Sequence, residues 1–178
     1  SYYNTQRTAQ IEITEENFEP SSVKWEMQGK AQVGKWKSKG NTHSCQVVFS
    51  EDGSYGLHFS CEDKAGNKEK YEEKENFVID RTAPVIEVFY EDESASNIRY
   101  FNHPRTAEIV IREQNFDENQ VKIGTELENI SGKKPQITQF SSHKGVHKAK
   151  VFYEESGEYC LKVSCGDKAG NQAKEFEG

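Results

Sequence analysis

The stretch GSYGLHFSCEDKAGN at residues 53–67 returns as GEYCLKVSCGDKAGN at residues 157–171, which is 104 positions later. An earlier stretch, RTAQIEITEENF at residues 7–18, returns as RTAEIVIREQNF at residues 105–116, which is 98 positions later. A period of about a hundred residues is too long for a solenoid unit and fits a whole small domain. The sequence therefore predicts two similar domains in tandem.

The two copies differ in length at one place. The offset is 98 at the Val23–Val121 pair and 104 at the Trp36–Phe140 pair, so the second copy has six additional residues between them. The polar stretch TELENISGKKPQ lies there, and we expect it to form a loop, because loops accept insertions at little cost. Binding specific to one copy is to be sought first where the copies differ, in residues 124–136 and around Trp36.

We place the domains at residues 1–80 and 81–178. The sequence starts inside a repeat whose second copy has an upstream strand, and it stops where the first copy continues with Phe77-Val78-Ile79-Asp80. We therefore expect a segment of a longer array, in which the first strand of the first domain is missing or truncated and the last strand of the second domain is truncated.

Composition limits the class of protein. The chain has 178 residues, 33% hydrophobic and 30% charged, with a net charge of −7. The acidic residues are spread over both halves, so we predict neither a nucleic-acid partner nor direct membrane contact. No apolar run approaches the roughly 18 residues of a membrane span. Each domain has enough apolar residues for a modest core.

Apolar and polar residues alternate through most of the chain, as in Ala9-Gln10-Ile11-Glu12-Ile13. Alternation with period two, and with β-branched and aromatic residues, is typical of half-buried strands. About seven short strands per hundred residues predict an all-β fold, with each domain an antiparallel β-sandwich. We expect strands near residues 7–14, 22–27, 33–38, 43–50, 54–62 and 70–79, and near 84–91, 105–112, 120–125, 136–141, 146–153, 158–165 and 172–177.

Three motifs resemble one protein family. They are the D-K-A-G-N loop at 63–67 and 167–171, the junction V-I-D-R-T-A-P at 78–84, and the strand with Gly, Tyr and Leu at alternate positions before each loop. Together they resemble bacterial immunoglobulin-like domains, which occur in tandem arrays in surface proteins of Gram-positive bacteria. Leu57 and Leu161 stand where antibody-type domains have a cysteine, so inferences about antibody cores do not transfer.

The resemblance implies a function and a location. We expect a non-catalytic structural, spacer and adhesion module of a bacterial surface protein, without cofactors and located outside the cell. Its partners would be neighbouring repeats of the same array, and a host protein or a glycan are further options. Two alternatives stay open: a domain that itself binds a glycan or host protein, and accessory domains of a secreted carbohydrate-active enzyme.

The D-K-A-G-N loop has turn chemistry. An aspartate can accept hydrogen bonds from amides further along the turn, glycine supplies positive φ, and asparagine tolerates the left-handed region. This favours a structural role over ligand contact, although loops at one end of a sandwich often bind. We assign structural roles to Asp63, Gly66, Asn67, Asp167, Gly170 and Asn171, to Tyr55 and Tyr159 in the preceding strands, and to Pro84 in the junction.

The junction has no Gly/Ser linker, and Pro84 fixes φ, so we expect a semi-rigid connection. Asp63, Asp80 and Asp167 offer oxygen ligands in suitable regions. Calcium, however, takes six to eight oxygens, and the sequence has no dense acidic loop. We therefore predict no metal site.

The four cysteines are assigned by strand alternation. Cys45 and Cys61 both lie on inward positions at the same end of the first sandwich, so we expect a disulfide between them. In the second domain the position of Cys45 is occupied by Ala149. Cys160 and Cys165 lie on opposite faces of one strand, roughly 16 Å apart, which is too far for a bond. Cys165 is then a small buried residue and Cys160 an outward thiol.

Trp25 and Trp36 allow two interpretations. Exposed tryptophans can stack on sugars, so both are candidate ligand contacts. Their repeat counterparts Ile123 and Phe140 are apolar, which favours packing in the core. The histidines are scattered, and His43 and its counterpart His147 are expected to have a structural role, since a zinc site would need further ligands.

Overall fold

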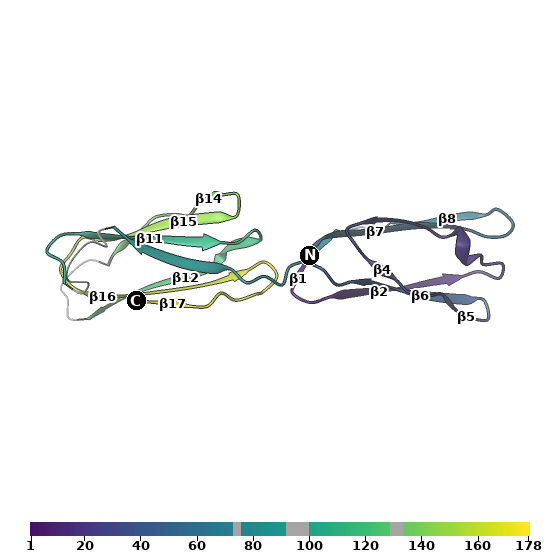
Figure 1. Ribbon diagram of the computed structural model, residues 1–178, viewed down its shortest axis with the longest axis horizontal. Helices are drawn as coiled ribbons and strands as arrows, with labels where there is room; N and C mark the ends of the chain where they lie inside the picture. Colours follow the sequence, from purple (N-terminus) through teal and green to yellow (C-terminus); the bar gives the residue numbers. More distant parts are fainter. Residues whose placement is uncertain (73–75, 92–99, 129–133) are drawn as a thin grey trace. The chain divides into compact units, whose positions relative to one another are not determined.

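The computed structural model describes residues 1–72, 76–91, 100–128 and 134–178, with the side chains of 127 and 128 left out. The chain divides into two compact units, Ser1–Arg81 and Thr82–Gly178. Each unit consists of two layers of strands (Figure 1). A single 3-10 turn, η1 (Pro20–Ser22), is the helical element among the described residues. Within them, no helix is long and apolar enough to cross a membrane.

Unit 1 is built from two sheets. One sheet has the order β2–β6–β4, with β5 also pairing with β6; its strands are β2 (Arg7–Thr14), β4 (Gln32–Val33), β5 (Lys37–Lys39) and β6 (Thr42–Phe49). The other has the order β1–β9–β7–β3, with β8 also pairing with β7; its strands are β1 (Tyr2–Tyr3), β3 (Lys24–Gln28), β7 (Gly53–Glu62), β8 (Lys68–Glu72) and β9 (Phe77–Ile79).

Unit 2 repeats this arrangement, with an additional strand, β10, at the edge of its first sheet. Its first sheet has the order β10–β11–β15–β13, with β14 also pairing with β15; the strands are β10 (Val85–Tyr90), β11 (Arg105–Arg112), β13 (Gln136–Ile137), β14 (Ser141–His143) and β15 (Val146–Tyr153). Its second sheet has the order β12–β16–β17, formed by β12 (Phe116–Glu128), β16 (Glu158–Asp167) and β17 (Phe176–Glu177). β11 therefore has a strand on both edges.

Alternate residues of the facing sheets form the two cores. Unit 1 buries Ile11, Val47, Phe49, Tyr55, Leu57 and Ile79. Unit 2 buries Ala107, Ile109, Ile111, Val151, Tyr153, Leu161, Val163 and Cys165. Because each cluster draws side chains from both sheets of its unit, the predicted all-β sandwich is confirmed.

Several strand predictions need correction. The strand expected at 33–38 is two short strands, β4 and β5, on either side of Gly34, whose amide donates to the Gln46 carbonyl (2.7 Å). The strand expected at 70–79 is β8 and β9, and its positions 73–75 lie outside the described residues. The strand expected at 172–177 is reduced to β17, which covers two residues.

The loop expected at TELENISGKKPQ, residues 125–136, is also partly wrong. β12 continues to Glu128 and pairs with β16 along that length, so 125–128 is strand; positions 129–133 lie outside the described residues. The equivalent strand of unit 1 ends earlier because Gly29 follows it with φ +80°. Its repeat counterpart is Leu127, which continues the extended backbone.

Candidate functional site

The D-K-A-G-N turn of unit 1 is held by its aspartate. Asp63 Oδ1 accepts from the backbone amides of Ala65 and Asn67 (2.8 Å each), and Asp63 Oδ2 accepts from the Asn67 side-chain amide (2.6 Å). Bonds to the Asn67 side chain and backbone hold the pKa of the Asp63 carboxyl below its ordinary value. Gly66 takes φ +89°, which a Cβ would strain.

Unit 2 repeats this geometry. Asp167 accepts from the Asn171 backbone amide at 2.9 Å and from its side-chain amide at 2.7 Å, and Gly170 again has φ +89°. The structural roles proposed for these residues thus rest on the same bonds in both units. Asp167 is 3% exposed, so its carboxylate faces protein and not bulk water.

A second turn lies beside each D-K-A-G-N turn. In unit 1, Glu15 Oε1 accepts from the Asn17 amide (2.8 Å), and the Asn17 carbonyl accepts from the Lys64 amide (3.2 Å), which joins the two turns. In unit 2, Glu113 Oε1 accepts from the Asn115 amide (2.7 Å), and the Asn115 carbonyl accepts from the Lys168 amide (3.0 Å). The recurring glutamates therefore cap turns.

A histidine completes this arrangement in each unit. His147 Nε2 lies 2.8 Å from the Glu113 carbonyl, and its Nδ1 lies 2.7 Å from Ser142 Oγ. Because a carbonyl only accepts, Nε2 carries a proton and donates to it; in the neutral ring, Nδ1 then accepts from the serine hydroxyl. The ring stacks on Phe116 with centroids 3.9 Å apart. In unit 1 the same contacts are made by His43 with Glu15, Ser38 and Phe18.

We call this group the turn lock: Glu15, Asn17, Ser38, His43, Asp63 and Asn67 in unit 1, and Glu113, Asn115, Ser142, His147, Asp167 and Asn171 in unit 2. The side chains that could suggest acid–base chemistry are here bonded to backbone amides, carbonyls and hydroxyls. In unit 2, Glu113 and Asp167 offer carboxylate oxygens within 4.8 Å of each other. Calcium takes six to eight oxygens, so a cation there would need ligands beyond these two.

The two tryptophans pack within unit 1. The Trp36 ring meets Phe18 edge to face at 4.9 Å and stacks near Trp25 at 6.3 Å. Trp25 also lies 5.2 Å from the Phe59 ring. Both tryptophans are half-buried and pack against the core cluster, and the Phe18–Trp36 contact recurs as Phe116–Phe140 in unit 2. This packing favours the core interpretation, and ligand contact at Trp25 and Trp36 stays a prediction.

The predicted disulfide is not formed. Cys45 and Cys61 are both free thiols, as are Cys160 and Cys165. Cys45 is buried, and its Sγ lies 3.1 Å from the Gly34 carbonyl of the neighbouring segment, so its thiol has a hydrogen-bond partner within its own layer. Burial raises the pKa of the Cys45 thiol. Cys165 is buried in the core of unit 2, as expected.

The tyrosines before the loops form a repeated corner. Tyr55 Oη donates to the Glu51 carbonyl and Tyr159 Oη to the Glu155 carbonyl, each at 2.7 Å. Each bond ties a strand to the turn four residues upstream, which is the geometry of a tyrosine corner. Pro84 directly precedes β10.

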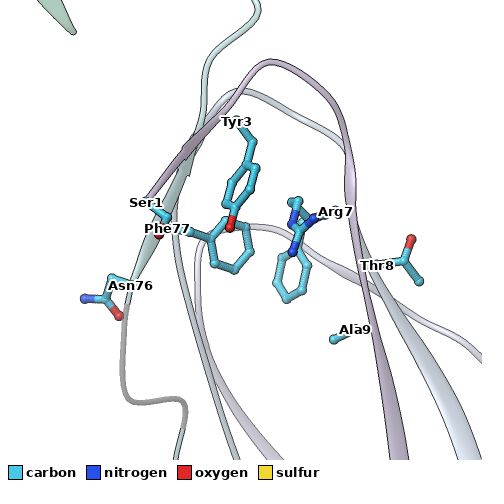
Figure 2. A pocket seen from close by; sticks show the side chains of 8 residues that line it. Ser1, Tyr3, Arg7, Thr8, Ala9, Asn76 and Phe77 are labelled. Atoms are coloured by element: carbon cyan, nitrogen blue, oxygen red, sulfur yellow. The ribbon is translucent and has the colours of Figure 1, made fainter. Parts of the chain in front are cut away.

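One feature of unit 1 was not predicted. A pocket of about 300 Å³ is lined by Ser1, Tyr3, Arg7, Thr8, Ala9, Phe49, Asn76 and Phe77. Figure 2 shows Tyr3 and Arg7 side by side in it, and the Arg7 guanidinium carbon lies 4.1 Å from the centroid of the Tyr3 ring. The only sequence signal was the recurrence of Arg7 as Arg105 and of Tyr3 as Phe101.

Comparison with known proteins adds one result. The model of a family described as bacterial Ig-like domain matches residues 9–81, which is most of unit 1. A search of curated proteins found no match.

Proposed function

We propose that this chain, whose first unit belongs to the bacterial Ig-like domain family, is a non-catalytic structural spacer and adhesion module of a bacterial surface protein. In this role it holds an adhesive or catalytic head away from the cell, with neighbouring repeats as its partners. Domains of this family are commonly extracellular, which supports that location. The turn lock supports the structural role, because its polar side chains are bonded internally in both units.

The observation that carries the proposal is the parallel pairing of β1 and β9 in unit 1. β1 and β9 lie side by side and run parallel, with Tyr2 opposite Val78 and Tyr3 opposite Ile79. The amide of Val78 donates to the Ser1 carbonyl (2.9 Å), and the amide of Asp80 donates to the Tyr3 carbonyl (2.9 Å). Residues 1–3 and 78–80, which lie about 75 positions apart in the sequence, are thus hydrogen-bonded directly to each other.

This pairing suits a domain that bears tension. Tension on a chain pulls β1 towards its N-terminal end and β9 towards its C-terminal end. Because the strands are parallel and adjacent, these forces slide one strand along the other and load their hydrogen bonds together. An antiparallel hairpin pulled from its open end would instead lose its bonds one at a time.

Single-molecule pulling of the full chain tests this role. Val78→Pro removes the amide that donates to Ser1 and should lower the unfolding force of unit 1. The unfolding event of unit 2 in the same molecule is the internal control, recognised by its different length. An unchanged force for unit 1 would count against the load-bearing role.

The location is tested in the bacterium that encodes the chain. Antibodies raised against the 178-residue chain should label intact cells, and brief protease treatment of intact cells should remove the signal. Labelling that requires lysed cells would contradict a surface role. A glycan array probed with the wild type and with Trp25→Ala and Trp36→Ala tests the alternative: a hit that both folded variants lose would favour direct binding.

A further inference from the structure

Residues 27–50 of unit 1 form a basic stretch in a chain whose net charge is −7. They contain four lysines and no aspartate or glutamate. Three of these lysines, Lys35, Lys37 and Lys39, lie in or just before β5, and all three are exposed. We call these three residues the lysine stripe. Like charges gathered on so short a segment repel one another, so an anionic ligand would relieve that repulsion.

The backbone that carries the lysine stripe is fixed from the core side. Ser38, in the middle of β5, bonds the buried ring of His43 (2.7 Å), so its side chain points inward. Because the side chains of a strand alternate, Lys37 and Lys39 on either side of it point outward, roughly 7 Å apart at the backbone. Trp36, just before β5, packs against the core cluster. The lysines are thus positioned before a ligand arrives, which reduces the entropy lost on binding.

The lysine stripe is not neutralised within unit 1. None of its three ammonium groups forms an ion pair with a residue that the structure describes. In unit 2, by contrast, the outward Lys148 of β15 is paired with Glu108 of β11 at 3.1 Å. The counterparts of that pair in unit 1 are the uncharged Ser44 and Gln10. The positive charge on this face of unit 1 is therefore available to a ligand.

Lysines on an edge strand can also serve to prevent pairing with another sheet. The equivalent strand of unit 2 shows that this edge does not need them. β14 pairs with β15 as β5 pairs with β6, and it carries Ser141 and His143 where β5 has its two lysines. Protection of the edge therefore does not account for the lysine stripe.

The strands beside the lysine stripe add hydroxyl groups to the same face. Ser44 and Thr42 of β6 lie opposite the two lysines of β5, and Thr14 of β2 lies beyond Thr42. Hydroxyl groups both donate and accept hydrogen bonds, which matches the hydroxyl groups of a sugar chain. Glu12 lies beyond Ser44, two strands away from the lysines. Its charge directs an anionic ligand to the β5 side of the face.

We propose that the lysine stripe and these hydroxyl groups form a binding surface for an anionic polysaccharide, whose carboxylate or sulfate groups contact the lysines. The outward side chains of β2, β5 and β6, which are all described, include no aromatic ring on which a nucleic-acid base could stack. The apolar side chain among them is the half-buried Val48, which leaves a peptide partner little to bury. This surface goes beyond the spacer role and does not depend on it.

Isothermal titration calorimetry of the full chain tests the surface with three probes at low ionic strength. They are heparin oligosaccharides, which carry sulfate and carboxylate groups, oligogalacturonate, which carries carboxylate groups alone, and neutral dextran. The anionic probes should bind and dextran should not, and the affinity should fall as salt is added, because exposed charges are screened. Chemical-shift mapping should place the bound probe on residues 35–44. Binding of heparin without oligogalacturonate would identify sulfate as the recognised group.

Two variants of the lysine stripe test the role of its charge. The triple variant Lys35→Gln, Lys37→Gln and Lys39→Gln should bind the anionic probes about tenfold more weakly, since exposed ion pairs are individually weak but here act together. The corresponding triple arginine variant keeps the charge and should keep the affinity. Because all three positions are exposed, both variants should have the circular dichroism spectrum of the wild type.

The matched control combines Lys24→Gln, Lys122→Gln and Lys174→Gln, which are exposed and change the net charge equally at other places. It should bind as the wild type does. Three outcomes would overturn the proposal: no binding of either anionic probe at millimolar concentration, equal losses in the control and in the glutamine variant of the stripe, or tighter binding of polyglutamate than of both glycans, which would assign the stripe to an acidic polypeptide. Self-association of that glutamine variant with unchanged glycan binding would assign the lysines to protection of the edge instead.

Discussion

His147 is the residue at which three segments of unit 2 meet. It bonds the Glu113 carbonyl after β11 and Ser142 in β14, and it stacks on Phe116 at the start of β12. His147→Ala removes the hydrogen bond to that carbonyl and opens a cavity beside Phe116, so unit 2 should lose about 2–3 kcal/mol of unfolding free energy. Urea unfolding followed by circular dichroism measures the loss.

Two controls accompany this substitution. His143→Ala changes an exposed histidine of the same segment and should shift stability by less than about 0.5 kcal/mol. Both tryptophans of the chain lie in unit 1, so the fluorescence transition should not move in the His147→Ala protein. Equal losses from His143→Ala and His147→Ala would refute the lock.

The turn lock also gives a pH dependence. The folded-state pKa of Asp63 lies below its ordinary value, chiefly because the Asn67 side chain and backbone donate to the carboxylate. A lowered folded-state pKa contributes stability above the unfolded pKa of about 4, and this contribution is lost as pH falls through the folded value. The difference in urea midpoint between wild type and Asp63→Asn should therefore be largest at neutral pH and shrink below pH ~4. A constant difference from pH 2 to 7 would rule this out.

The cysteines provide a test of the corrected pairing. The intact mass should be the same with and without reductant, and all four thiols should be alkylated once the chain is unfolded. In the folded protein Cys165 should react slowest, because burial raises its pKa to about 11 and leaves little thiolate at neutral pH. A mass that rises on reduction would restore the Cys45–Cys61 bridge.

At the scale of elements, Gly29 decides where β3 ends. A Cβ on Gly29 would lie 2.5 Å from the Tyr55 ring, at a backbone φ of +80°. Gly29→Ala should therefore cost about 3 kcal/mol, from overpacking and from the left-handed backbone. Gly40 has φ +59° with no atom within 4 Å of a Cβ, so Gly40→Ala should cost about 1 kcal/mol. The urea midpoint followed by tryptophan fluorescence measures the stability of both variants. Similar losses for the two would contradict a steric clash between the added Cβ and Tyr55.

How far the sequence predicts each element depends on whether its cause is local. The strand β2, with Ala9, Ile11 and Ile13 on one face, follows from alternation alone, and the turn at Asp63 follows from its own residues. The division of 33–38 into β4 and β5 depends on the bond from Gly34 to Gln46, which is a partner distant in sequence. The parallel pairing of β1 with β9 is non-local in the same way.

In the candidate site, too, the local features could be predicted from the sequence and the non-local ones could not. Asp63 and its copy Asp167 were identified as turn residues because the D-K-A-G-N motif contains its own bonding partners. The pocket beside Arg7 could not be predicted, because its walls come from segments that are distant in sequence, such as Tyr3, Phe49 and Phe77. Strand alternation gave Cys45 and Cys61 the same face, but it could not show that the Cys45 thiol turns towards the Gly34 carbonyl.

At the scale of the whole chain, the two units should differ in stability when residues 1–178 are produced as a separate polypeptide. In unit 2, β10 packs three side chains on the core: Ile86, Val88 and Tyr90. Among the described residues of unit 1, no strand pairs with the corresponding edge of β2. Each side chain is partly buried, so together they should favour unit 2 by about 3 kcal/mol. Urea should therefore unfold the chain in two steps, with unit 1 first.

The chain carries its own probe for this order. Both tryptophans report unit 1, whereas circular dichroism reports strands of both units. The fluorescence midpoint should coincide with the first of two dichroism transitions. Val88→Ala, which removes one of the β10 contacts, should lower the second transition by about 1–2 kcal/mol and leave fluorescence unchanged. If fluorescence instead follows the later transition, the unpaired edge of β2 does not limit the stability of unit 1. The aromatic packing around Trp36 would then offset the free energy that unit 1 loses at this edge.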